Sequence, residues 1–126
     1  MKRLWIGITI FLLLLGLGLG IFGASQAFFS KFSQKVENAG EIALAGNWVY
    51  AEELAEECRE KWDTYRHFWA SFTDHAPIEE IGLLFSQLEL YARQRLATEF
   101  AACCHALAKE ADAIAESHGI AWWSLL

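Results

Sequence analysis

LWIGITIFLLLLGLGLGIFG, residues 4–23, is an unbroken run of twenty uncharged and mostly apolar residues that directly follows Met1-Lys2-Arg3. A helix rises about 1.5 Å per residue, so a run of this length spans the roughly 30 Å hydrocarbon core of a bilayer. We therefore predict a transmembrane anchor over residues 4–24. A basic start at residues 1–3 precedes the anchor, and an outer domain at residues 25–126 follows it.

The charges on the two sides of the anchor predict its orientation. Lys2 and Arg3 favour a cytoplasmic N-terminus, and a long following domain crosses the membrane largely regardless of its own charge. We expect a single-pass protein of the cell membrane with an extracytoplasmic C-terminal domain. The alternative is a cleaved signal peptide, since Ser25-Gln26-Ala27 offers small residues for processing. Signal-peptide apolar regions usually run about 7–15 residues, so the longer run here favours a retained anchor.

Small residues recur every four positions near the end of the anchor. Gly16, Gly20 and Ala24 therefore share one face of the predicted helix. Such a face lets two membrane helices approach closely, either as a homodimer or with a different membrane protein. Glycine is also common in membrane helices for other reasons, which is the plainer interpretation. These three residues are candidate interaction residues.

Composition restricts the outer domain to one helical unit. Residues 25–126 contain eight Lys or Arg and sixteen Asp or Glu, a net charge of −8. This acidic balance argues against nucleic acid as a partner and against electrostatic docking on anionic lipid. The single proline, Pro77, and the lack of alternating apolar stretches argue against sheets. About 100 residues provide one modest core, so the fold class is all-α.

Apolar positions at three- and four-residue spacing predict four helices in this domain, near residues 25–45, 48–73, 77–95 and 98–118. The first continues the transmembrane helix outward. Gly46 is suited to its C-terminal cap and Asn47 to the N-cap of the next helix, whereas Gly119 is expected to end the last helix. Short connections favour antiparallel neighbours, which makes the assembly an antiparallel bundle of about four helices.

This topology returns two segments to the membrane side of the bundle. The corner at 74–77 and the C-terminal tail should both lie near the bilayer surface, where tryptophan is favoured. The candidate contacts with lipid or a membrane partner are Trp69, Phe72, Trp122 and Trp123. The alternative is that the terminal tryptophan pair covers the core of the bundle itself.

The residues able to carry chemistry do not form a recognisable pattern. Cys58, Cys103 and Cys104 are interpreted as small buried residues, although a Cys58 disulfide with either of the others stays open. No Cys-x-x-Cys or His-x-x-x-His occurs, so we predict no metal and no cofactor. Asp74 and His75 form either a helix-corner cap or a pH-responsive group. No catalytic residue is predicted, and the protein is not expected to be an enzyme.

The whole pattern resembles an uncharacterised bacterial family of single-span membrane proteins, catalogued as domain of unknown function 4363. The resemblance covers nearly the whole chain. It is carried by the basic start with one span and by Gly46-Asn47-Trp48, Trp62, Asp74-His75, Ile78 and Ile81. It implies a helical outer domain without an assigned activity, and members encoded near multi-pass membrane proteins imply a membrane partner. The family tends to end in an Asn-Ile-Leu-like tail, whereas this chain ends in Ser124-Leu125-Leu126.

The sequence therefore predicts a membrane-anchored, non-catalytic interaction module, an accessory or scaffolding subunit that binds a membrane protein or itself. The first alternative is an extracytoplasmic helical domain that senses a small ligand, an ion or pH, because its tryptophan and phenylalanine side chains can line a pocket between helices. An envelope hydrolase is the third and weakest interpretation.

Overall fold

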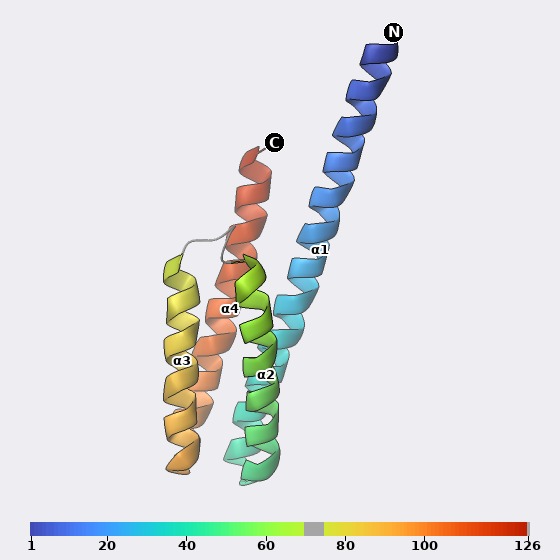
Figure 1. Ribbon diagram of the computed structural model, residues 1–126. Helices are drawn as coiled ribbons and strands as arrows, with labels where there is room; N and C mark the ends of the chain where they lie inside the picture. Colours follow the sequence, from blue (N-terminus) through green and yellow to red (C-terminus); the bar gives the residue numbers. More distant parts are fainter. Residues whose placement is uncertain (70–74, 126) are drawn as a thin grey trace.

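In the part of the chain that the structure describes, the backbone forms four α-helices (Figure 1). They are α1 (Lys2–Leu44), α2 (Trp48–Trp69), α3 (His75–Arg93) and α4 (Ala97–Leu125). This computed structural model describes the backbone of residues 1–69 and 75–125. Side chains in that part are described except those at 21, 22, 25, 68, 69, 75–77 and 117–125. The all-α class and the antiparallel bundle predicted from the sequence are confirmed.

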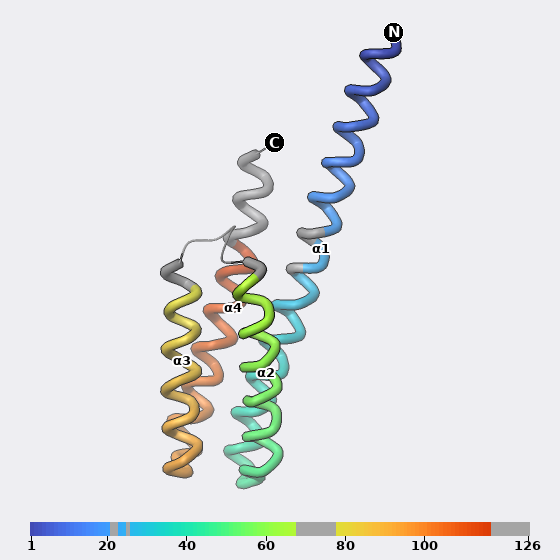
Figure 2. Tube along the Cα trace, viewed as in Figure 1, coloured from blue at the N-terminus to red at the C-terminus, as the bar shows by residue number. Residues whose placement is uncertain are grey.

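The predicted anchor and the first bundle helix form one continuous helix. The 43 residues of α1 correspond to a length of about 64 Å. Residues Lys2–Gly20 have a mean hydropathy of 2.0 and none of them is buried in the protein. This segment extends past the other helices, as Figure 2 shows, and it is long and apolar enough to cross a membrane.

The central contact of the bundle is the antiparallel pair of α1 and α4. The Gln26 side-chain amide donates to the Ala115 carbonyl at 2.9 Å, and the Ser33 hydroxyl donates to the Ala108 carbonyl at 3.4 Å. Seven residues further along each helix, a Cβ on Gly40 would lie 3.2 Å from the Ala101 Cα. These three contacts, seven residues apart on both helices, define an antiparallel seam between α1 and α4.

The two outer helices attach to this central pair rather than to each other. α2 packs on α1 and α3 packs on α4, while α2 and α3 barely touch. Phe32 of α1 fills the space between the outer helices, with its ring centroid 6.2 Å from that of Trp62 and 6.0 Å from that of Phe85. One side chain of the central pair thus connects both outer helices to the core.

The apolar stripes predicted from the sequence form this core. The buried residues from those stripes are Phe29, Phe32, Val36, Ala39, Ala43, Ala51, Cys58, Trp62, Ile81, Phe85, Leu88, Ala92, Phe100, Cys104, Leu107, Ala111 and Ile114. Each helix contributes one continuous face, so hydrophobic periodicity assigns most of the core positions, although it omits the buried Cys103, Ala108 and Ala115.

Two corners with the same hydrogen-bonding pattern close the end of the bundle opposite the apolar segment. After α1, Gly46 has φ +89°, its N–H donates to the Ala43 carbonyl, and the Asn47 N–H donates to the Ile42 carbonyl. This is a Schellman motif, and the Asn47 side chain then accepts from the Tyr50 N–H as the N-cap of α2. Both predicted caps are confirmed.

The corner between α3 and α4 has the same bonds without a glycine. Arg95 adopts φ 57°, its N–H donates to the Ala92 carbonyl, and the Leu96 N–H donates to the Tyr91 carbonyl. The Arg95 guanidinium also lies 5.3 Å from the Trp48 ring centroid and 2.7 Å from a Glu52 carboxylate oxygen. These contacts with α2 offset the strain of a left-handed backbone at a residue with a Cβ.

Two of the predicted helix boundaries are corrected. The helix expected over 77–95 is α3, His75–Arg93, because the left-handed turn at Arg95 ends it earlier. The helix expected over 98–118 is α4, Ala97–Leu125, so Gly119 does not end it. A glycine inside a helix costs only about 1 kcal/mol relative to alanine, and no proline follows it. Residues 70–73 of the predicted 48–73 helix lie outside the described residues.

The close approach at Gly40 leads to a stability prediction. Gly40→Leu should lower the free energy of unfolding by about 1–3 kcal/mol, because even a Cβ there would lie 3.2 Å from both the Ala101 Cα and the Cys104 Cβ. Thermal unfolding in detergent, followed by circular dichroism, measures the effect.

The matched control is Gly82→Leu in α3, where an added Cβ meets nothing within 4 Å. This variant should be neutral or stabilising by up to about 1 kcal/mol, because leucine is the better helix former. Equal melting temperatures for the two leucine variants would contradict the close seam.

Candidate functional site

The small-residue face of the apolar segment is open. Gly16, Gly20 and Ala24, called the glycine face below, are all exposed, and a Cβ added at Gly16 or Gly20 would meet nothing within 4 Å. Ala24 precedes Ser33 by nine residues, which at 3.6 residues per turn places the two on opposite sides of α1. Because Ser33 belongs to the seam, a helix approaching the glycine face would not collide with α4.

The remaining predicted contact residues lie outside the described side chains. Phe72 and Asp74 lie outside the described residues altogether. Trp69 is the last residue of α2, His75 is the first of α3, and Trp122 and Trp123 lie in the last turns of α4. The predictions that Asp74 and His75 form a cap or a pH-responsive group, and that the tryptophans touch lipid or a partner, stay predictions.

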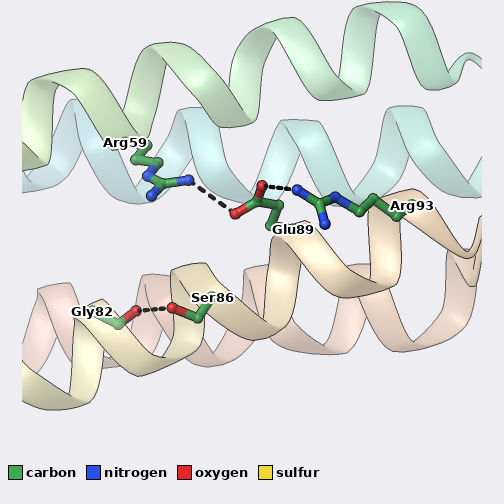
Figure 3. A network of polar contacts seen from close by, with 5 residues as sticks. All are labelled: Arg59, Gly82, Ser86, Glu89 and Arg93. Atoms are coloured by element: carbon green, nitrogen blue, oxygen red, sulfur yellow. Dashed lines mark hydrogen bonds and ion pairs between the residues drawn. The ribbon is translucent and has the colours of Figure 1, made fainter.

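A groove of about 480 Å³ separates α2 from α3. Its walls include the core residues Phe85, Leu88 and Phe100. Figure 3 shows Glu89 of α3 between two arginines, at 3.2 Å from Arg59 of α2 and 2.7 Å from Arg93 of α3. All three side chains are about half exposed or more. Exposed pairs contribute about 0–1 kcal/mol each, so charge pairing across the groove holds α2 to α3 only weakly.

A second hollow, of about 510 Å³, lies between α1 and α2 and is called the lysine pocket here. Its lining includes Phe28, Lys31, Phe32, Lys35, Lys61 and Tyr65. The Phe28 and Tyr65 rings stack with their centroids 3.7 Å apart and an interplanar angle of 3°. Seven residues further along α1, the Lys35 amine lies 3.7 Å from a Glu57 carboxylate oxygen. The pocket therefore joins an aromatic wall to a group of amines.

The cysteine thiols are buried, and none of the three is in a disulfide. Burial raises the pKa of Cys58 and of Cys103 to about 11, and it raises the pKa of Cys104 further. The Cys103 thiol donates to the Leu84 carbonyl at 3.1 Å, which links α4 to α3. These thiols stay protonated at neutral pH, so they act as core residues, as expected from the sequence.

The titratable groups do not converge on a reactive centre in the part of the chain that the structure describes. No group of three His, Cys, Asp or Glu side chains there is arranged to hold a metal ion. His105 lies 3.2 Å from a Glu37 carboxylate oxygen, but both side chains are at least half exposed. This exposed His105–Glu37 pair is not enclosed in a cleft, which is the setting in which active sites place their acid and base groups.

The fold and these surfaces define a class of protein, a small helical bundle carried on a single apolar helix. The family model described as domain of unknown function 4363 matches residues 25–123. The chain belongs to this family, which confirms the resemblance seen in the sequence. No curated protein and no solved structure matches the chain.

The sequence did not reveal which residues of different helices meet. Lys31 and Lys35 are one helical turn apart, which is visible in the sequence, but Lys61 joins them only through the pairing of α1 with α2. The seam residues Gln26 and Ser33 were also missed, because polar residues in a mostly apolar stripe give no sign of their partner carbonyls. The seven-residue spacing of Gln26, Ser33 and Gly40 was the one sequence feature that could have indicated a shared helix contact.

The raised thiol pKa values predict slow alkylation of the native protein. At pH 8 N-ethylmaleimide should modify the folded chain slowly, because the thiols are buried and protonated, and should modify all three cysteines after unfolding in guanidinium chloride. Mass spectrometry counts the adducts. Fast native labelling of Cys58 would contradict its burial.

The same pKa values predict how the thiols affect stability as the pH changes. Unfolded thiols ionise near pH 8.5, so these groups favour the native state below about pH 8.5, and this contribution is lost as the pH rises through 11.

Proposed function

We propose that this protein is a membrane-anchored, non-catalytic interaction module that acts as an accessory or scaffolding subunit of a membrane protein assembly. In this proposal Lys2–Gly20 lies in the cell membrane, the N-terminus is cytoplasmic and the bundle is extracytoplasmic. The partner is a membrane protein or a second copy of the chain.

The observation that carries the proposal is the continuity of α1. Its first half is apolar and wholly unburied by the chain, while its second half is the central helix of the bundle. A bundle joined to its anchor by an unbroken helix has a fixed height and rotation relative to the membrane. Such rigidity favours the presentation of a surface to a neighbouring protein, since a flexible tether would add an entropic cost to binding.

The glycine face supplies a contact within the membrane. Small residues at four-residue spacing let a second helix approach closely enough for backbone packing, which drives association in lipid. Gly16 and Gly20 are open in the isolated chain, which supports a partner rather than an internal role.

The length of α4 supports a second contact at the membrane surface. Ala115 pairs with Gln26, and α4 continues for ten more residues, to Leu125. At about 1.5 Å per residue this end rises about 15 Å, to the level of Gly16 on α1 if the two helices stay parallel. In this proposal the tail with Trp122 and Trp123 meets lipid or the partner.

The test is chemical cross-linking in native membranes, pull-down of a C-terminally tagged chain and mass spectrometry. We expect one membrane protein, or a second copy, at close to one per chain. Gly16→Leu and Gly20→Leu should reduce this recovery several-fold while the bundle keeps its melting temperature, because leucine separates the helix backbones.

Gly7→Leu is the matched control, since Gly7 is equally open and lies nine residues from Gly16, on the other side of α1. It should leave the complex intact. Recovery of the wild-type chain only as an uncross-linked monomer would contradict the proposed function. If all three leucine variants reduced the recovery of the complex equally, the glycine face would be ruled out as the specific contact, while the proposed function would stand.

The tail contact predicts a separation of binding from stability. Trp122→Ala combined with Trp123→Ala should reduce the yield of the cross-linked complex more than it lowers the melting temperature, because the pair is proposed to face lipid or a partner. Paired cross-linking and thermal unfolding measure both effects. A large fall in melting temperature with the complex retained would identify the pair as core residues.

A further inference from the structure

Amines gather in the lysine pocket although the outer part of the chain is strongly acidic. Residues 25–126 contain eight Lys or Arg, and three of them line this one pocket. Elsewhere Arg59, Arg66, Arg93 and Arg95 each have a carboxylate oxygen within 3.4 Å. Within the described residues Lys31 and Lys61 have no such ion pair, and Lys35 has only the longer contact with Glu57.

Lys35 and Lys61 both line the pocket, and each shifts the pKa of the other. The pKa of Lys61 is lowered, first because Lys35 lies beside it and then by desolvation. Two neighbouring positive charges repel each other, and an anion placed between them offsets this repulsion. Glu57, 3.7 Å from Lys35, and Glu60, which lines the pocket, offset part of this repulsion, but the three amines still outnumber these two carboxylates.

The pocket is amphipathic along the direction of α1. The stacked rings of Phe28 and Tyr65 form its end nearer the apolar segment, and Lys35 lies seven residues further from it. A phospholipid has the same polarity, with its acyl chains toward the bilayer centre and its phosphate outward. Rings at the inner end and amines at the outer end complement both parts of such a molecule.

The inner end of the pocket lies near the height of the lipid headgroups. Along the helix Phe28 lies about 6 Å, Lys31 about 10 Å and Lys35 about 16 Å beyond Ala24, the end of the predicted anchor. The headgroup layer adds about 5–8 Å to each side of the hydrocarbon core. A lysine side chain can turn its amine toward that layer while its methylene groups cover apolar surface.

We propose that the lysine pocket binds one anionic phospholipid from the surrounding bilayer, with the phosphate between the amines of Lys31, Lys35 and Lys61 and the lipid body against Phe28 and Tyr65. The net charge of the outer domain opposes general attraction to an anionic surface. The lipid is therefore held individually by a local site. This inference goes beyond the proposed function and stands without a protein partner.

The test is native mass spectrometry of the full-length chain in non-ionic detergent, titrated with phosphatidylglycerol, phosphatidylcholine or the water-soluble sn-glycerol 3-phosphate. Phosphatidylglycerol should bind at least about fivefold more tightly than either of the others. Lys31→Gln combined with Lys61→Gln should weaken this binding by about 25-fold, at roughly fivefold for each lysine near a bound phosphate.

Two further variants separate a site from a general charge effect. Arg93→Gln combined with Lys109→Gln removes two exposed positive charges away from the pocket and should leave binding unchanged. Lys31→Arg combined with Lys61→Arg keeps the charge and should retain binding, which preserves the test if the glutamine variant does not fold.

Three results would overturn the inference. The first is equal affinity for phosphatidylglycerol and phosphatidylcholine. The second is an equal loss in the Arg93/Lys109 variant, which would indicate a general charge effect. The third is binding of glycerol 3-phosphate as tight as that of the lipid, which would assign the pocket to a soluble phosphate. None of these results depends on whether a protein partner is recovered from membranes.

Discussion

The antiparallel seam between α1 and α4 is the contact on which the rest of the molecule depends. Gly40 brings the helix axes close, and the side chains of Gln26 and Ser33 fix the register by donating to carbonyls of α4. Because α2 and α3 pack on different members of this pair, their positions follow from the seam rather than from contact with each other. The groove between α2 and α3 is a consequence of this arrangement, and the exposed charge pairs across it do not replace packing.

The sequence predicted the elements of this fold better than their assembly. The four stripes, the cap at Gly46 and the N-cap at Asn47 are local features, with spacing and backbone chemistry that can be seen in the chain. The turn at Arg95 was hard to predict from the sequence because no glycine marks it. Its left-handed backbone is instead held by contacts of the Arg95 side chain with α2. At Gly119 the opposite error occurred: the glycine predicted a helix end, but α4 continues through it, since a helix tolerates one glycine. The glycine face was identifiable from spacing, whereas the lysine pocket required the register of α1 with α2.

The distribution of polar groups explains why surfaces rather than a catalytic centre carry the proposed function. The buried titratable groups named in the core are thiols that stay protonated, and the described carboxylates that form ion pairs are at least about half exposed. Membership of a family of unknown function agrees with this pattern but assigns no activity. The glycine face and the lysine pocket both lie on α1, so one helix would position a protein contact and a lipid contact relative to the same membrane.

The rigidity of α1 in a bilayer is the property to measure first. Spin labels at positions 10 and 38, both exposed, would report the distance across the junction between anchor and bundle in a chain whose three cysteines are replaced by alanine. The two positions are 28 residues apart, so a continuous helix predicts a narrow distribution near 42 Å, at about 1.5 Å per residue. A broad distribution centred at clearly shorter distances would reveal a hinge, and the bundle would then have no fixed orientation relative to its anchor.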